Sequence, residues 1–225
     1  NDNGSFLLAL FEFFLFFAWF MCLFWVFGDI FRSKDLGGVA KTLWVLFVIF
    51  TAGFGPQMTE VAGRVSDGFL VHPVNSRRSL LELTLPALER GAAQAGRTLD
   101  DLEVVCVTII VTGRTEEELT RSREAVREQL AFYGTTPAYL PVFELHGYGD
   151  LHPELQSLAR QDRWKEMSTL IDDDLLETIA VVGEPSEIAT KVRTRLDGIS
   201  DAVSLVNNRA PDPAHFAEVV AALHR

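Results

Sequence analysis

The chain has 225 residues, and its formal net charge is −11 because 31 acidic side chains outnumber 20 basic ones. This acidic balance excludes a nucleic-acid-binding protein, which needs a basic surface. The sequence also has no Cys/His spacing typical of zinc and no P-loop. Its two cysteines, Cys22 and Cys106, lie in apolar runs, which indicates buried, reduced thiols rather than a disulfide.

The first long apolar run covers residues 6–27 and contains one charged side chain, Glu12. A run of this length can cross a bilayer as a helix. A signal peptide does not fit, because the start of the chain has no Lys or Arg and no small-residue cleavage site follows. We interpret Glu12 as a charge tolerated near the membrane interface, and a contact with a partner helix is the alternative.

A short polar connector follows and carries Arg32, Lys34 and Lys41. No basic residue precedes the apolar run, so the positive-inside rule places the connector in the cytoplasm. The sequence therefore predicts a protein of the cell membrane. Its anchor and connector cover residues 1–41, and a cytoplasmic domain covers residues 42–225.

Residues 45–73 have the order strand, glycine loop, helix, turn and strand that is expected of a parallel βαβ unit. Val45–Phe50 is an unbroken apolar run, as in a strand covered on both faces. Apolar side chains then recur at helical spacing over residues 58–65, and residues 69–71 restart the strand pattern.

The glycine loop of this unit contains Ala52, Gly53, Gly55 and Pro56. Free backbone N–H groups at the start of the following helix favour an anion, most often a phosphate. The alternative is that the glycines only make a tight turn.

Three polar residues follow the second strand of the unit, namely His72, Asn75 and Arg77. This is the strand end at which parallel α/β folds build their sites, and Arg77 would suit a phosphate-bearing substrate. Packing of His72 and simple exposure of Arg77 are the alternatives. We take all three as candidate substrate contacts, and His72 and His146 as candidates for an acid/base role.

The remaining elements are predicted from capping and periodicity. A helix with Leu81, Leu85 and Leu88 on its buried face is kinked or restarted at Pro86. Residues 134–180 are the least regular part, with short helices in which His146 either lines a pocket or packs under a loop. The other predicted elements are a strand Glu103–Thr112, a helix from Thr115 to Tyr133, a helix Glu184–Leu196, a strand Ala202–Val206 and a helix Pro213–His224.

The segments AGFGPQMTEVAGRVSDGFLVHP, LEVVCVTIIVTG and IAVVGEPSEIATKV resemble the C-terminal half of luciferase-like flavin and deazaflavin oxidoreductases. The resemblance starts at Thr51 and is strongest to an actinobacterial branch that uses the deazaflavin coenzyme F-420. The family fold is a (β/α)8 barrel that binds its cofactor at the C-terminal ends of the strands. The resemblance therefore implies that Ala52, Gly53, Gly55 and Pro56 contact coenzyme F-420, with FMN as the alternative.

Residues 1–50, which include GDIFRSKDLGGVAKTLWVLFVI, resemble the N-terminal membrane hairpin of small actinobacterial membrane proteins of the phospholipase D N-terminal type. In that family a second membrane helix follows the connector. Here the distance from Lys41 to Pro56 is too short for a comfortable span. We therefore predict a strand, and a second membrane helix over residues 42–55 is the alternative. Whether such a fusion is natural is left open.

The predicted fold class is α/β, namely the last four strands of a TIM-type (β/α)8 barrel, preceded by a transmembrane helix. The four strands are Leu43–Phe50, Phe69–Val71, Glu103–Thr112 and Ala202–Val206. A complete barrel needs eight strands and about 250 residues. In the family, the missing half brings the usual acid/base residues. We therefore expect a homo-oligomer or a partner chain that completes the barrel.

The predicted function is that of a membrane-anchored, luciferase-like oxidoreductase or monooxygenase fragment. It would bind a deazaflavin or flavin for hydride transfer with a small-molecule substrate, and the chain alone would be inactive. The alternative is a catalytically inactive, membrane-associated interaction protein with a relic barrel segment. No metal is expected, and the sequence does not identify the substrate.

Overall fold

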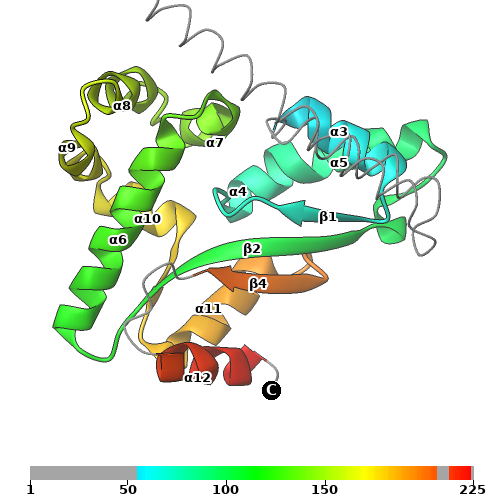
Figure 1. Ribbon diagram of the computed structural model, residues 1–225. Helices are drawn as coiled ribbons and strands as arrows, with labels where there is room; N and C mark the ends of the chain where they lie inside the picture. The colour runs from blue at the N-terminus through cyan, green and yellow to red at the C-terminus, as the bar shows by residue number, and fades with distance from the viewer. Residues whose placement is uncertain (1–54, 207–212, 224–225) are drawn as a thin grey trace, which may run out of the picture. The chain divides into compact units, whose positions relative to one another are not determined.

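The computed structural model of the protein describes residues 55–206 and 213–223 (Figure 1). The predicted membrane helix at residues 6–27, the connector and the strand Leu43–Phe50 lie outside the described residues, so all three stay predictions. Within the described ranges, no helix combines the length and the apolar character that crossing a membrane requires.

A sheet of four parallel strands forms the centre of the described part (Figure 1). Its strands are β1 (Gly68–Val71), β2 (Glu103–Thr112), β3 (Val181–Gly183) and β4 (Ala202–Val206). β2 is the longest and pairs with each of the other three, for example Cys106 with Val71 of β1 and with Val203 of β4. The predictions of β1, β2 and β4 are confirmed, and so is the α/β class with a parallel sheet.

The third strand, β3, was missed by the sequence analysis. It has only three residues and pairs with the end of β2, Ile110 lying opposite Val181. Its apolar residues continue the pattern of the helix before it, so neither the length nor the periodicity of this stretch marks a strand.

The strands are connected and covered by helices. Their bounds are α3 (Pro56–Val65), α4 (Arg77–Ser79), α5 (Leu85–Gln94), α6 (Glu116–Gly134), α7 (Leu140–Leu145), α8 (Leu151–Ala159), α9 (Trp164–Thr169), α10 (Asp173–Ile179), α11 (Pro185–Leu196) and α12 (Pro213–Leu223). A π-helical segment covers Leu80–Thr84, and short 3-10 helices cover Leu99–Asp101 and Pro137–Tyr139. The predicted N-cap Thr115 is confirmed, because its side chain accepts the backbone N–H of Glu118.

The π-helical segment corrects the predicted buried face of the helix after β1. Leu80 is fully buried, whereas Leu81, which was predicted to face the core, is 46% exposed. A π turn holds more residues than an α turn, so it moves the buried stripe by about one residue. Pro86 lies in the first turn of α5, which follows the π-helical segment without a break. Thr84 has helical backbone angles and its side chain caps no N–H group, so the predicted restart from this residue is wrong.

β2 separates two hydrophobic clusters. Cys106 and Ile110 on one face pack against the helices α5, α11 and α12, while Ile109 and Val111 on the other face pack against α6 and α10. All four side chains are fully buried. This two-sided burial explains why the sequence of β2 is continuously apolar and rich in β-branched residues.

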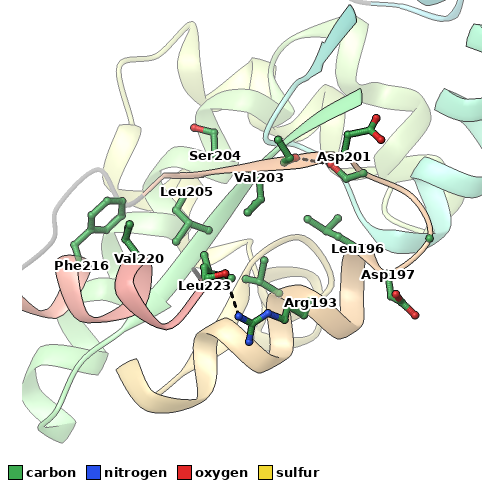
Figure 2. A pocket seen from close by; sticks show the side chains of 14 residues that line it. Arg193, Leu196, Asp197, Asp201, Val203, Ser204, Leu205, Phe216, Val220 and Leu223 are labelled. Carbon is green, nitrogen blue, oxygen red and sulfur yellow. Dashed lines mark hydrogen bonds between the residues drawn. The ribbon is translucent and has the colours of Figure 1, made fainter. Parts of the chain in front are cut away.

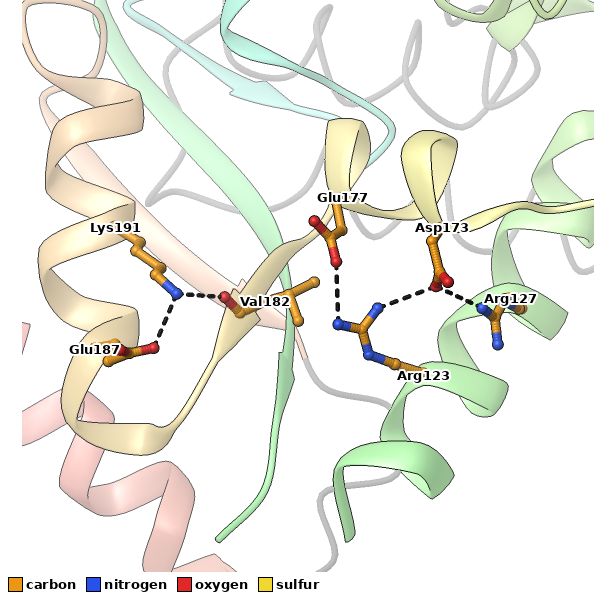
Figure 3. Close-up of polar contacts among 7 residues, drawn as sticks. All are labelled: Arg123, Arg127, Asp173, Glu177, Val182, Glu187 and Lys191. Atoms are coloured by element: carbon orange, nitrogen blue, oxygen red, sulfur yellow. Dashed lines mark hydrogen bonds and ion pairs between the residues drawn. The ribbon is translucent and has the colours of Figure 1, made fainter. Parts of the chain in front are cut away.

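Ion pairs join α6 to α10 (Figure 3). Arg123 pairs with Asp173 at 3.1 Å and with Glu177 at 3.0 Å, and Arg127 pairs with Asp173 at 2.6 Å. On the neighbouring element, Lys191 of α11 donates to the carbonyl oxygen of Val182 in β3. The first three contacts therefore join two helices of the insertion between β2 and β3, and the last joins α11 to β3.

Candidate functional site

Four of the candidate residues line a single cavity at the C-terminal end of β1. Gly55 and Pro56 come from the start of α3, and His72 and Asn75 from the loop after β1. The π-helical segment and the stretch from Ala138 to Val142 close the cavity, whose volume is about 90 Å³. The other two loop candidates, Ala52 and Gly53, lie outside the described residues.

The start of α3 offers backbone donors to this region. Gly55 is the N-cap residue, its backbone is extended, and no side chain caps the helix. The hydroxyl of Thr59 donates to the carbonyl oxygen of Gly55 at 3.2 Å, which fixes the first turn. The first N–H groups of an α-helix have no acceptor within the helix, so they are suited to an anion or a carbonyl oxygen.

His72 lies between two tyrosine rings of the insertion. The ring of Tyr139 stacks on it at a centroid distance of 4.2 Å and an angle of 17°, and Tyr133 meets it edge-on at 5.1 Å. Nδ1 of His72 accepts the backbone N–H of Val74 at 3.2 Å, so the proton of the neutral ring is on Nε2. Burial lowers the pKa of His72 from 6.5 to about 4, so the ring is neutral at pH 7.

Asn75 ties the loop after β1 to β2. Its side-chain amide donates to the carbonyl oxygens of His72 and Val107, both at 2.8 Å, and the residue is only 2% exposed. Its Oδ1 is buried without a hydrogen-bond partner. The side chain of Asn75 therefore fixes the backbone of His72, while its own Oδ1 accepts no hydrogen bond.

His146 lies beside the cavity and does not line it. Its Nε2 shares a hydrogen bond of 2.8 Å with the hydroxyl of Ser76, which also caps α4. Burial and the positive charges of Arg78 and Arg195 lower the pKa of His146. The two histidines proposed from the sequence therefore have different surroundings, and only His72 lines the cavity.

The side chains of Arg77 and Arg195 both donate hydrogen bonds to backbone carbonyl oxygens. Arg77 donates to the carbonyl oxygens of Arg195 and Asp197 at the end of α11, at 2.8 and 3.0 Å, so its guanidinium is engaged away from the cavity. Arg195 donates to the carbonyl oxygens of Asn75 and Ile179. Burial lowers the pKa of Arg195 to about 10, which leaves it charged at pH 7.

Tyr133 and Tyr139 are the site residues that the sequence analysis missed. They are the first and last residues of the segment YGTTPAY, which carries part of the family resemblance, but nothing in its pattern assigns either tyrosine to a site. Their proximity to His72 depends on how the insertion folds back over the end of β1, which local patterns do not reveal.

A second cavity of about 770 Å³ lies between β4, α11 and α12 (Figure 2). Leu196, Val203, Leu205, Phe216 and Leu223 give it an apolar lining, and Arg193 closes one end by donating to the carbonyl oxygen of Leu223 at 3.0 Å. None of the candidate residues named from the sequence contributes to this cavity. The described residues also contain no group of three or more side chains that could hold a metal ion.

The chain is similar in sequence to several curated proteins. An uncharacterized protein of Mycobacterium tuberculosis is 47% identical over 155 residues, which is 69% of this chain and 46% of that protein. An F-420-dependent glucose-6-phosphate dehydrogenase of Intrasporangium calvum is 26% identical over 194 residues, which is 85% of this chain and 51% of that protein. The chain thus spans about half the length of the curated relatives that it matches.

The solved structure of the coenzyme F-420 dependent tetrahydromethanopterin reductase from Methanopyrus kandleri has the same fold over 76% of this chain and 47% of its own. The TM-score is 0.58 and the sequence identity is 24%. The family model described as luciferase-like monooxygenase matches residues 45–201. This match covers well over half of the sequence, so the chain belongs to the luciferase-like monooxygenase family, whose relatives include F-420-dependent oxidoreductases.

Proposed function

We propose that this chain holds part of the deazaflavin site of an F-420-dependent oxidoreductase that acts on a small molecule. The observation that carries the proposal is that Gly55, Pro56, His72 and Asn75 line one cavity at the C-terminal end of β1. Parallel α/β sheets and barrels bind their ligands at this edge. The F-420-dependence named for relatives favours the deazaflavin, and FMN is the alternative cofactor.

The cavity is large enough for only a part of such a cofactor. A volume of about 90 Å³ is well below the 300–1,000 Å³ typical of a complete ligand site. The first N–H groups of α3 would bind a phosphate of the cofactor, together with Ala52 and Gly53 of the same loop. A bound deazaflavin supplies hydride transfer, while the residues of the chain orient it and exclude water.

We also propose that a second copy or another chain completes this site. Leu70 of β1 is 60% exposed, and among the described residues β1 and β4 each have a neighbouring strand, β2, on one edge only. An uncovered strand edge and face normally pair with another element. Attachment to the cell membrane through residues 1–41 stays a separate prediction, as does the cytoplasmic location of the rest.

The Gly55→Val variant should fold normally and lose affinity for coenzyme F-420. A Cβ at this position meets no atom within 4 Å, and the extended backbone accepts any residue, so the fold has room for the new side chain. The same side chain would occupy the approach to α3. Titration of the purified protein with F-420, followed by deazaflavin fluorescence, measures the affinity, and we expect a loss of about tenfold or more.

The matched control is Ala93→Val, which adds a comparable side chain on the exposed side of α5. It should bind F-420 like the wild type. If Gly55→Val binds F-420 with wild-type affinity, the glycines only make a tight turn and the loop is not part of the cofactor site.

The strictly monomeric chain should not turn over a substrate even when it binds the cofactor. Its described residues contain no charged acid/base group in the cavity, and the lack of positioned proton-transfer groups costs roughly 10²–10⁴ in rate. The measurement follows the deazaflavin absorbance with alcohols, aldehydes and sugar phosphates, while light scattering reports the oligomeric state. Turnover by monomers would show that His72 or His146 suffices for catalysis.

A further inference from the structure

The side chain of Asn75 has one polar atom without a partner. Its amide nitrogen donates both of its hydrogens, to the carbonyl oxygens of His72 and Val107. A flipped amide would place Oδ1 against these two oxygens, so the orientation of the amide is fixed by its neighbours. Oδ1 itself is buried and accepts no hydrogen bond. Buried polar atoms are nearly always hydrogen-bonded, so this acceptor needs a donor from a molecule that enters the cavity.

The backbone of Asn75 is held as firmly as its side chain. The N–H group donates to the carbonyl oxygen of Pro73 at 2.9 Å, and the carbonyl oxygen accepts a hydrogen bond from Arg195. Oδ1 therefore cannot turn to another partner within the protein. An acceptor that is fixed before binding loses little conformational freedom when a ligand arrives, which favours recognition of a matching donor.

Asn75 lines the cavity opposite no other unpaired side chain of this kind. The other described residues that have a buried, unpaired polar atom in the side chain do not line the cavity; they are Thr108, Thr112, Gln129 and Arg195. The hydroxyl groups of Thr59 and Ser79 do line it, but both already donate to carbonyl oxygens. The cavity thus combines the backbone donors at the start of α3 with one fixed acceptor at Asn75.

This combination selects a particular arrangement of groups in the ligand. An ionised phosphate at the start of α3 has acceptor oxygens only, so it cannot donate to Oδ1 of Asn75. A hydroxyl group on a neighbouring carbon can donate to it. The volume of about 90 Å³ equals that of roughly three water molecules at about 30 Å³ each, which gives room for a hydroxyl-bearing carbon next to the phosphate.

Building on the proposed function, we propose that Oδ1 of Asn75 accepts a hydrogen bond from a hydroxyl group of a polyol phosphate, whose phosphate binds at the start of α3. Asn75 is then a residue that determines specificity by touching the ligand. The same chemistry has two sources. Flavin and deazaflavin cofactors carry a polyol chain next to a phosphate, and a sugar phosphate would bring the two groups as a substrate.

The first test compares two probes in calorimetric titrations of the full-length protein. Glycerol 3-phosphate carries hydroxyl groups, whereas propyl phosphate has the same phosphate and carbon chain without them. Glycerol 3-phosphate should bind about tenfold more tightly or better, because propyl phosphate leaves Oδ1 buried and unpaired. Equal affinities would mean that water satisfies Oδ1 and would overturn the proposal, as would the absence of binding by both probes.

The second test repeats the comparison with variants. Asn75→Leu removes the acceptor and should bring the two affinities within about twofold of each other. The matched control is Thr108→Val, because the hydroxyl of Thr108 is equally buried and unpaired but lies outside the cavity lining. It should keep the wild-type preference. An Asn75→Leu protein that keeps the preference would overturn the proposal, and if this variant fails to fold, the wild-type comparison decides.

Competition with F-420 distinguishes the two sources and the two proposals. If F-420 displaces glycerol 3-phosphate, the hydroxyl group belongs to the cofactor, and if both bind together, it belongs to a substrate. A preference for glycerol 3-phosphate without any binding of F-420 would refute the proposed function and leave the role of Asn75 in place. F-420 binding combined with equal affinities for the two probes would refute the role of Asn75 and leave the cofactor site in place.

Discussion

Between pH 7 and pH 4 the protein should lose about 2 kcal/mol of unfolding free energy through His72 alone. Burial lowers the pKa of the folded ring from 6.5 to about 4, whereas the unfolded chain has the ordinary pKa. Below pH 6.5 the unfolded state therefore binds more protons than the folded state, and stability falls as the pH drops. The loss ends near pH 4, where the folded ring also becomes protonated.

The magnitude follows from the size of the shift. A difference of about 2.5 pKa units corresponds to about 3.4 kcal/mol at 1.36 kcal/mol per unit. The ring is only partly buried, so screening by solvent reduces this to about 2 kcal/mol.

Urea unfolding at several pH values measures this effect in the wild type and in His72→Gln. The carboxylates also titrate toward pH 4, so the quantity to compare is the difference between the two proteins. We expect the stability of His72→Gln to fall less steeply between pH 6.5 and pH 4, while Tyr139→Phe keeps the wild-type slope. Parallel curves for wild type and His72→Gln would mean that His72 titrates as an exposed histidine.

The strands that could be predicted from sequence are those with unmistakable local signals. The bounds of β2 and β4 were predicted correctly because each is an apolar, β-branched run between polar turns. β3 has three residues and owes its existence to pairing with the end of β2, which no local pattern records. The π-helical segment at Leu80–Thr84 could not be predicted either. It only changes which residues face the core by about one position, and the pattern on each side of it is that of an ordinary α-helix.

The part of the candidate site that could be predicted from sequence lies at the C-terminal ends of parallel strands. Gly55, Pro56, His72 and Asn75 meet because residues at the C-terminal ends of parallel strands gather at one edge of the sheet. Arg77 follows only two residues after Asn75, yet the start of α4 turns it toward α11. The role of Tyr139 depends on tertiary packing of the insertion and is visible only in the folded structure.

Two glycines at the contact between α3 and α5 also have a role that the sequence analysis did not predict. The sequence analysis interpreted the glycines of the loop before α3 and passed over Gly63 and Gly91, which lie inside helices. In the structure, a Cβ on Gly63 would lie 2.2 Å from the carbonyl oxygen of Leu88, and one on Gly91 would lie 1.8 Å from that of Glu60. The two helix backbones are therefore in direct contact, and a side chain at either glycine would prevent this close approach.

The Gly91→Val variant should lose about 3 kcal/mol of unfolding free energy or more. The atoms in its way belong to the backbone of α3, including the nitrogen of Arg64 at 3.0 Å, so no side chain can rotate to make room. The gain in helix propensity on replacing glycine is well under 1 kcal/mol for valine and does not offset the clash. Urea unfolding measures the loss, and Ala93→Val on the exposed side of α5 should stay within about 0.5 kcal/mol of the wild type.

The same variant links the packing of α3 to the site. Pushing α3 away from α5 also moves Gly55 and Pro56, which form one wall of the cavity. Gly91→Val should therefore lower both stability and F-420 affinity, whereas Gly55→Val should lower affinity alone. A Gly91→Val protein that keeps wild-type stability would show that α3 can leave α5 at little cost. One that is destabilised but binds F-420 normally would show that the position of α3 does not matter for the ligand.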